Sequence, residues 1–321
     1  MSWTLPGVLR RNPYLFTLAL LVLAMFANYS FQENFFELRV VNGTLRGLLP
    51  TMLLTVGQAI VIIGGGIDLS VGTMVSMINA VLVTSISADS TPEQIAGAIL
   101  LAVLVGVIAG GFNGFCVAFL RLQPIVTTYA TSFIFSGIAL EVLPRPGGNI
   151  PRELSNAYRQ PLFEIPVAVY VIAVVLLLWF ILRSTRYGQF LFAVGGKSDA
   201  AYTTGVPVTF VKFSTYVWAG FFAAMAALAL TLLTGSGDPR LGDGMTLTTI
   251  VAVVLGGTRL SGGQGGIFGA IMGVALLTLV SNIISFANIS TWFQDLANAL
   301  IIIVALAGPE TLRMLRRIIR R

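Results

Sequence analysis

Apolar residues occur along this chain in long blocks rather than in narrow stripes. Blocks such as Tyr14 to Phe31, Ile95 to Leu120 and Val167 to Leu182 approach or exceed the roughly 20 residues with which a helix crosses a bilayer. A helix on the surface of a soluble domain would instead pair an apolar stripe with a charged face. The pattern therefore predicts an all-α integral membrane protein.

Ten segments have the length and composition of transmembrane helices. We expect them at about 14–31, 48–64, 70–88, 96–119, 125–143, 166–182, 213–234, 246–258, 267–285 and 292–307. All ten fall in a single domain over residues 1–321, with a polar loop at 183–212 and an Arg-rich tail at 309–321.

The basic residues predict how the chain is oriented. If both termini are cytoplasmic, 13 of the 19 Lys and Arg residues lie on the cytoplasmic side, among them Arg10, Arg11 and the tail. Cytoplasmic segments of membrane proteins are enriched in Lys and Arg. The net charge of +6 is therefore a topology signal rather than a sign of nucleic-acid binding, and we expect both termini inside.

Composition excludes several classes of chemistry. Of all residues, 56% are hydrophobic and 10% charged, there is no histidine, and Cys116 is the only cysteine. Catalysis by Ser-His-Asp or Cys-His groups, most zinc sites and an intrachain disulfide are thus ruled out. We expect no cofactor and no metal, and an intramembrane enzyme is disfavoured.

Two glycine-rich segments interrupt the apolar pattern. One runs from Ile63 to Gly72 and the other from Leu255 to Gly266, and both read Gly-Gly-x-x-Leu-Ser, from Gly65 and from Gly256, an offset of 191 residues. Backbone that leaves the helix at membrane depth survives only where protein or water covers it. These segments are therefore predicted to form a pathway wall or gate, with Asp68 and Ser70 capping a new helix. A purely structural hairpin is the alternative.

Two strings imitate ATPase motifs. Residues 260–264 spell the signature of ABC-type ATPases, and 196–198 end like a phosphate-binding loop. A P-loop requires a glycine at the position that Leu191 occupies, and the first string lies between two membrane spans. We therefore expect that this chain does not hydrolyse ATP.

A short helix is predicted in the loop between the sixth and seventh spans. Ser198 suits the N-cap and Asp199 the first turn, whereas Gly205 suits the position after the helix and Pro207 prevents its continuation. A helix of two turns is marginal in water. It should be ordered by packing on its own protein or by docking against a partner.

Three motifs together resemble the ribose-type permease family of bacterial ABC importers. They are Gly-Gly-Ile-Asp-Leu-Ser-Val-Gly at 65–72, the pattern of glycines and alanines at 188–205, and the string at 255–263. The chain departs from the family at Gln189 and Tyr202, where basic residues are frequent, and at Lys197, where Asn is frequent. The 188–205 loop is less basic as a result. These departures concern how an ATPase would dock on the loop and do not change the resemblance to the family.

The resemblance implies a ten-helix fold similar to the membrane subunit of the vitamin B12 importer. It implies uptake of a sugar across a bacterial inner membrane, with a cytoplasmic ATPase pair or fused tandem, an extracytoplasmic binding protein and a second permease copy or related permease as partners. ATPase coupling falls on residues of the short helix: Ser198, Asp199, Ala200, Ala201, Tyr202 and Gly205. The outer loop at 144–165 is a candidate to meet the binding protein, or is only a solvated connector.

Polar residues within the predicted spans are candidates to line the pathway. Together with Gly65, Gly66, Asp68 and Ser70 we single out Gln58, Asn79, Asn113 and Asn282. Each is equally well explained as a hydrogen-bonding contact between helices. An ATP-independent transporter or channel, a structural subunit, and an ABC permease for a nucleoside, an autoinducer or riboflavin remain alternatives.

Overall fold

The computed structural model describes residues 14–287, Phe293 and Leu296, and the secondary structure of this part is helical apart from isolated bridges. Its helices are α2 (Tyr14–Phe31), α3 (Leu38–Ile63), α4 (Val71–Ser85), α5 (Pro92–Ala118), α6 (Pro124–Val142), α7 (Arg152–Arg159), α8 (Val167–Ser184), α9 (Arg186–Gly196), α10 (Ser198–Thr203), α11 (Val208–Thr234), α12 (Met245–Leu255) and α13 (Ile267–Phe286).

Seven of these helices are long and apolar enough to cross a membrane: α2, α3, α5, α6, α8, α11 and α13. Two further apolar helices, α4 and α12, coincide with predicted spans but have only 15 and 11 residues. At 1.5 Å per residue they reach about 22 Å and 16 Å, less than the roughly 30 Å hydrocarbon thickness. The spans predicted at 70–88 and 246–258 thus coincide with helices that are shorter than predicted. The predicted span at 292–307 lies outside the described residues, apart from Phe293 and Leu296.

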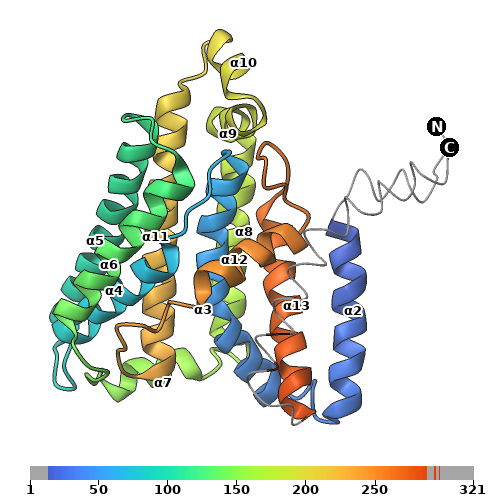
Figure 1. Ribbon diagram of the computed structural model, residues 1–321. Helices are drawn as coiled ribbons and strands as arrows, with labels where there is room; N and C mark the ends of the chain where they lie inside the picture. Colours follow the sequence, from blue (N-terminus) through green and yellow to red (C-terminus); the bar gives the residue numbers. More distant parts are fainter. Residues whose placement is uncertain (1–13, 288–292, 294–295, 297–321) are drawn as a thin grey trace, which may run out of the picture.

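Helices α3 and α11 occupy the middle of the molecule (Figure 1). On one side lie α5 and α6, and on the other side lie α13 and α2. The short helices α9 and α10 project from one end, whereas α7 lies at the opposite end. The 183–212 loop and the 144–165 loop therefore emerge at opposite ends of the helical bundle.

The packing of α5 on α11 depends on small residues. Gly106, Gly110 and Gly114 recur every four residues and thus share one face of α5. A Cβ atom at Gly106 or Gly110 would overlap the backbone of α11, where Gly220 lies opposite both. Small residues let membrane helices approach at backbone distance, where van der Waals contact and interhelical bonds replace the absent hydrophobic drive.

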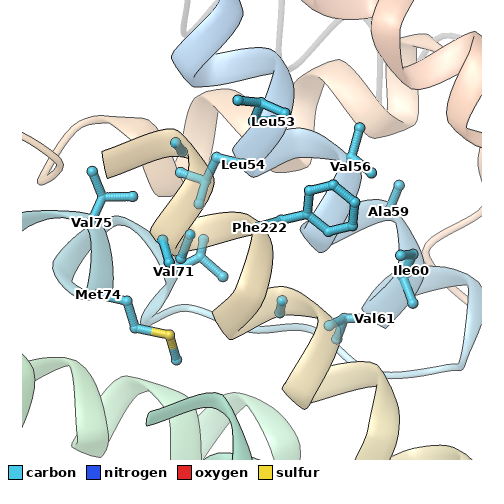
Figure 2. Packing of buried hydrophobic residues seen from close by; sticks show 14 of the residues in the cluster. Leu53, Leu54, Val56, Ala59, Ile60, Val61, Val71, Met74, Val75 and Phe222 are labelled. Carbon is cyan, nitrogen blue, oxygen red and sulfur yellow. The ribbon is translucent and has the colours of Figure 1, made fainter. Parts of the chain in front are cut away.

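Helix α3 is buried along most of its length. Figure 2 shows Phe222 of α11 lying among Leu54, Val56 and Ala59 of α3. Gly57 lets the helices approach here, since a Cβ atom would lie 3.0 Å from the Cβ of Phe222. Protein covers α3 from Leu48 to Ile63, whereas Gly65, in the break that follows, is exposed.

Candidate functional site

The helices α3 and α12 end in the same way. In each, a first glycine (Gly64, Gly256) bonds to the carbonyl four residues back, and a second (Gly65, Gly257) has a φ of 85° or 83°. The next residue donates to the carbonyl five residues back in both, a bond that defines the Schellman motif. The two helix ends correspond at an offset of 192 residues, one more than the offset of 191 at which the strings align. The strings align Gly65 with Gly256, whereas in the structure Gly64 is the residue that corresponds to Gly256.

Three distant glycine pairs meet where α3 ends. Gly65 lies against Gly195 at the end of α9, where a Cβ atom would come 3.3 Å from the Gly195 Cα. A Cβ atom at Gly262 would lie 2.6 Å from the Gly195 oxygen and 2.8 Å from the Gly65 Cα. The Gly263 amide donates to the Ile63 carbonyl over 2.9 Å. We call this contact of 63–66, 195–196 and 262–263 the glycine junction.

A buried polar cluster follows the junction. The Ser70 amide and hydroxyl both donate to Asp68 Oδ1, over 2.8 and 2.7 Å. Asn113 Nδ2 on α5 donates to the Ser70 hydroxyl over 2.7 Å and more weakly to Asp68 Oδ2 over 3.4 Å. The partners of this fully buried carboxylate are thus neutral groups. Ser70 precedes α4 as predicted, but its side chain binds Asp68 and Asn113 rather than the first turn of α4.

The extended segment between α3 and α4 is also fixed to α6. The Leu69 amide donates to Thr128 Oγ1 over 2.9 Å, and this hydroxyl donates to the Pro124 carbonyl over 2.9 Å. Each backbone polar group that is bonded in this way avoids the cost of burial without a partner. The 64–70 segment is therefore held by α5, α6 and the glycine junction together.

The starts of α4 and α12 cross each other. A Cβ atom at either Gly72 or Gly242 would overlap the backbone oxygen of the other. The Gly72 amide donates to Thr246 Oγ1 over 3.0 Å, and the Gly242 amide donates to Ser76 Oγ over 2.9 Å. Gly72, in the first turn of α4, and Gly242, shortly before α12, are thus buried in one reciprocal contact.

The short helix α10 forms close to the predicted position. Lys197, not Ser198, is its N-cap, because the chain turns helical one residue earlier than the serine pattern suggested. Gly205 has the predicted left-handed conformation, with a φ of 82°. Tyr202 is 74% exposed, whereas Ala201 is buried. Asp199, Ala200 and Gly205 are also exposed, so the outer side of α10 is available to a partner.

The other three predicted pathway residues, Gln58, Asn79 and Asn282, lie apart from the buried polar cluster or are not hydrogen-bonded to it. Gln58 is fully buried on α3, and neither of its amide atoms has a hydrogen-bond partner in the described part of the chain. Asn79, in the middle of α4, donates to Thr231 Oγ1 near the end of α11 and accepts from the Asp238 amide in the loop that follows. Asn282 is half-exposed and lies 15 residues along α13 from its start, about 22 Å from the loop that contains Gly263. The structure brings together Gly65, Gly66, Asp68, Ser70 and Asn113, but not Asn79 or Asn282.

Sequence reasoning missed the contacts that join the three motifs. Gly195 was noted only as part of a pattern, and Gly242 was not chosen as a site residue. A residue whose role is to leave space for a distant backbone has no local sign other than being glycine. The four-residue spacing of Gly106, Gly110 and Gly114 was the one signal available in advance.

Comparison with known proteins agrees with the motifs. Residues 40–306 match the family model described as branched-chain amino acid transport system / permease component. The chain is 32% identical over 307 residues to the ribose import permease protein of Bacillus subtilis, covering 93% of this chain and 92% of that protein. It is 29% identical to the ribose import permease protein of Haemophilus influenzae, with 87% of each covered. The autoinducer 2 import system permease protein of Yersinia pseudotuberculosis is 28% identical, over 92% of this chain and 85% of that protein. No solved structure gives a significant match.

Proposed function

Because the chain belongs to the family of branched-chain amino acid transport system permease components, we propose that it is the membrane subunit of an ATP-driven sugar importer. It is a multi-pass protein of the bacterial inner membrane. The observation that carries the proposal is the glycine junction, in which the exposed α9–α10 segment directly touches the ends of two broken membrane passages. ATP hydrolysis is assigned to partner subunits.

The contacts at the junction explain how a cytoplasmic partner moves the membrane helices. Gly195 and Gly196 end α9, and α10 follows after Lys197. An ATPase that binds α10 differently in its two nucleotide states shifts the equilibrium between two permease conformations. Backbone contact at Gly65 and Gly263 transmits a displacement of α9 to α3 and to the loop before α13, because no flexible side chain lies between them.

A sugar is favoured as the solute by the named relatives and by the buried polar groups. Three of the proteins described above are named for import of ribose or autoinducer 2. Asp68 is the one charged side chain among the buried residues that the structure describes, and it is bonded to Ser70. Amides such as those of Gln58 and Asn113, and hydroxyls such as that of Ser70, bind neutral hydroxyl-rich molecules without requiring a counter-charge.

The orientation and the assembly complete the proposal. We place α9 and α10 in the cytoplasm and α7 outside, in agreement with the excess of basic residues on the first side. Outside, a binding protein delivers the solute, and a second permease completes the pathway. Whether this second permease is a copy or a related chain follows from the composition of the purified complex.

The test is purification of the tagged permease from its host, with mass spectrometry of the chains that come with it. We expect an ABC ATPase with the wild type and its loss with Ala200→Glu, since a carboxylate at this exposed position of α10 adds charge to a docking surface. Ser87→Glu, exposed at the opposite end, is the matched control and should retain the ATPase.

Uptake in liposomes provides the second measurement, with D-ribose as the probe. The purified complex and its binding protein should take up D-ribose only when ATP is supplied on the ATPase side. A wild-type permease that purifies alone and transports without ATP would contradict the proposal and support a secondary transporter.

A further inference from the structure

The loop before α8 contains an unfavourable turn at Phe163 and Glu164. Leu162 and Ile165 exchange two backbone hydrogen bonds of 2.9 and 3.0 Å, which closes a two-residue loop between them. Phe163 and Glu164 have φ values of 49° and 64°. Positive φ at both central positions is the pattern of a type I′ turn, for which Asn and Gly are the favoured residues. Phenylalanine and glutamate therefore occupy positions whose backbone conformation is unfavourable for both residue types.

The side chain at this turn is unusually open. Phe163 is 85% exposed, the highest value among the large hydrophobic residues that the structure describes. Leu162 and Ile165 beside it are 53% and 42% exposed. Disfavoured backbone conformations persist where the surrounding structure enforces them, and they cluster at functional positions.

The turn is held on a rigid support. Pro161 precedes it and Pro166 follows it, so φ is restricted on both sides. Tyr170 Oη, on α8, donates to the Leu162 carbonyl over 3.2 Å. Upstream, Arg159 at the end of α7 donates to the Leu233 carbonyl over 2.7 Å and accepts from Asn42 over 2.8 Å. The phenyl ring is thus presented in a fixed place before any partner arrives.

The position of the turn favours an aqueous protein partner over lipid. Helix α8 has 18 residues. It is therefore about 27 Å long and nearly spans the hydrocarbon core by itself, so the turn before it lies outside that core. Glu164 would carry its carboxylate into the bilayer with the ring. A lipid contact also needs no fixed geometry, whereas a shaped protein pocket binds a preorganised side chain more tightly.

We propose that the Phe163–Glu164 turn is the anchor by which this permease engages its solute-binding protein. The inference rests on the proposed function, because it requires an importer with such a partner on the α7 side. The chemistry of the turn specifies an apolar socket edged by an arginine. A guanidinium group can stack on the phenyl face and pair with the Glu164 carboxylate at once.

The test uses the purified transporter in lipid nanodiscs and the binding protein that co-purifies with the wild type. Phe163→Asn removes the ring and supplies a residue that tolerates the turn, so folding should be as stable as in the wild type or more so. We expect the Kd for the binding protein to rise at least about tenfold, as for loss of an interface anchor. Glu164→Gly, the matched variant at the neighbouring position, keeps the ring and should raise the Kd less while reducing its salt dependence.

Phe163→Trp reports what surrounds the ring. Its emission should shift to the blue when the binding protein is added, and brominated lipid should quench it little. Strong quenching by brominated lipid with no response to the binding protein would overturn the proposal in favour of a membrane anchor. Equal Kd values for Phe163→Asn and the wild type would overturn it as well. If the wild type itself neither binds the protein nor responds to it with faster ATP hydrolysis, the proposed function fails instead.

Discussion

At the scale of single residues, neighbouring glycines in this protein have opposite roles. A Cβ atom at Gly195 would overlap the Ile63 carbonyl oxygen, whereas one at Gly196 would meet no atom within 4 Å. The glycine junction thus requires glycine at position 195, whereas position 196 has room for a larger side chain. The same contrast separates Gly110 from Gly111 on α5.

This contrast gives a matched pair of variants. Gly195→Ala should destabilise the protein by about 1–3 kcal/mol, the usual cost of inserting a methyl group into packed structure. It should also reduce coupling of ATP hydrolysis to uptake, because α9 can no longer lie against α3. Thermal unfolding in detergent and the ratio of solute transported to ATP hydrolysed measure the two effects.

Gly196→Ala is the control for that experiment. Alanine at this helical position should leave stability unchanged or slightly higher, since glycine within a helix is less stable than alanine. If Gly195→Ala behaves like Gly196→Ala in both measurements, the junction does not carry the coupling.

At the scale of elements, the molecule combines long apolar helices with two short ones, α4 and α12. The short α4 and α12 start at the Gly72–Gly242 contact, and hydroxyl groups of Thr246 and Ser76 satisfy the backbone amides there. Such hydroxyls allow a helix to begin within a membrane protein without leaving an amide unbonded. At the end opposite α10, α7 is fastened to α3 and α11 by side-chain bonds to backbone carbonyls.

The fastening of α7 predicts the effect of Arg159→Met. The guanidinium group donates to the Leu233 carbonyl in the last turn of α11, and loss of a charged hydrogen bond of this kind costs about 1–3 kcal/mol. We expect the loop at 143–165 to be cut faster in limited proteolysis, while the helical bundle remains folded.

Arg152→Met serves as the comparison for this variant, because Arg152 is exposed on the same helix. Its cleavage rate should equal that of the wild type. Unchanged cleavage in Arg159→Met would show that α7 is held by its other contacts, those of Asn42 and Tyr158.

At the scale of the whole molecule, the fold places two exposed segments at opposite ends of the bundle. Helix α10 is at one end, and α7 and the loop after α4 are at the other (Figure 1). An ATPase on the first and a binding protein on the second can therefore act at once without competing for surface.

The proposed orientation can be measured by cysteine labelling. Cys116 is buried and is first replaced by serine, after which single cysteines are introduced as Ser87→Cys and Tyr202→Cys. An impermeant maleimide should label the cysteine at 87 in intact cells and that at 202 only after the membrane is opened. The reverse pattern would invert the orientation and with it the assignment of both partner surfaces.

Local sequence was sufficient for features that depend on neighbouring residues. The nine predicted spans within the described residues each coincide with a helix, and the Gly-Gly pairs end α3 and α12, because periodicity and capping act over a few residues. The motif strings were sufficient to identify the family.

The contact of Gly65 with Gly195 and Gly262 was decided only in three dimensions, since backbone approach between distant glycines has no signature in any one of the segments. The tertiary structure also decided that Asp68 bonds to Ser70 and Asn113. Extended chain at membrane depth is stable only when distant helices supply its hydrogen-bond partners.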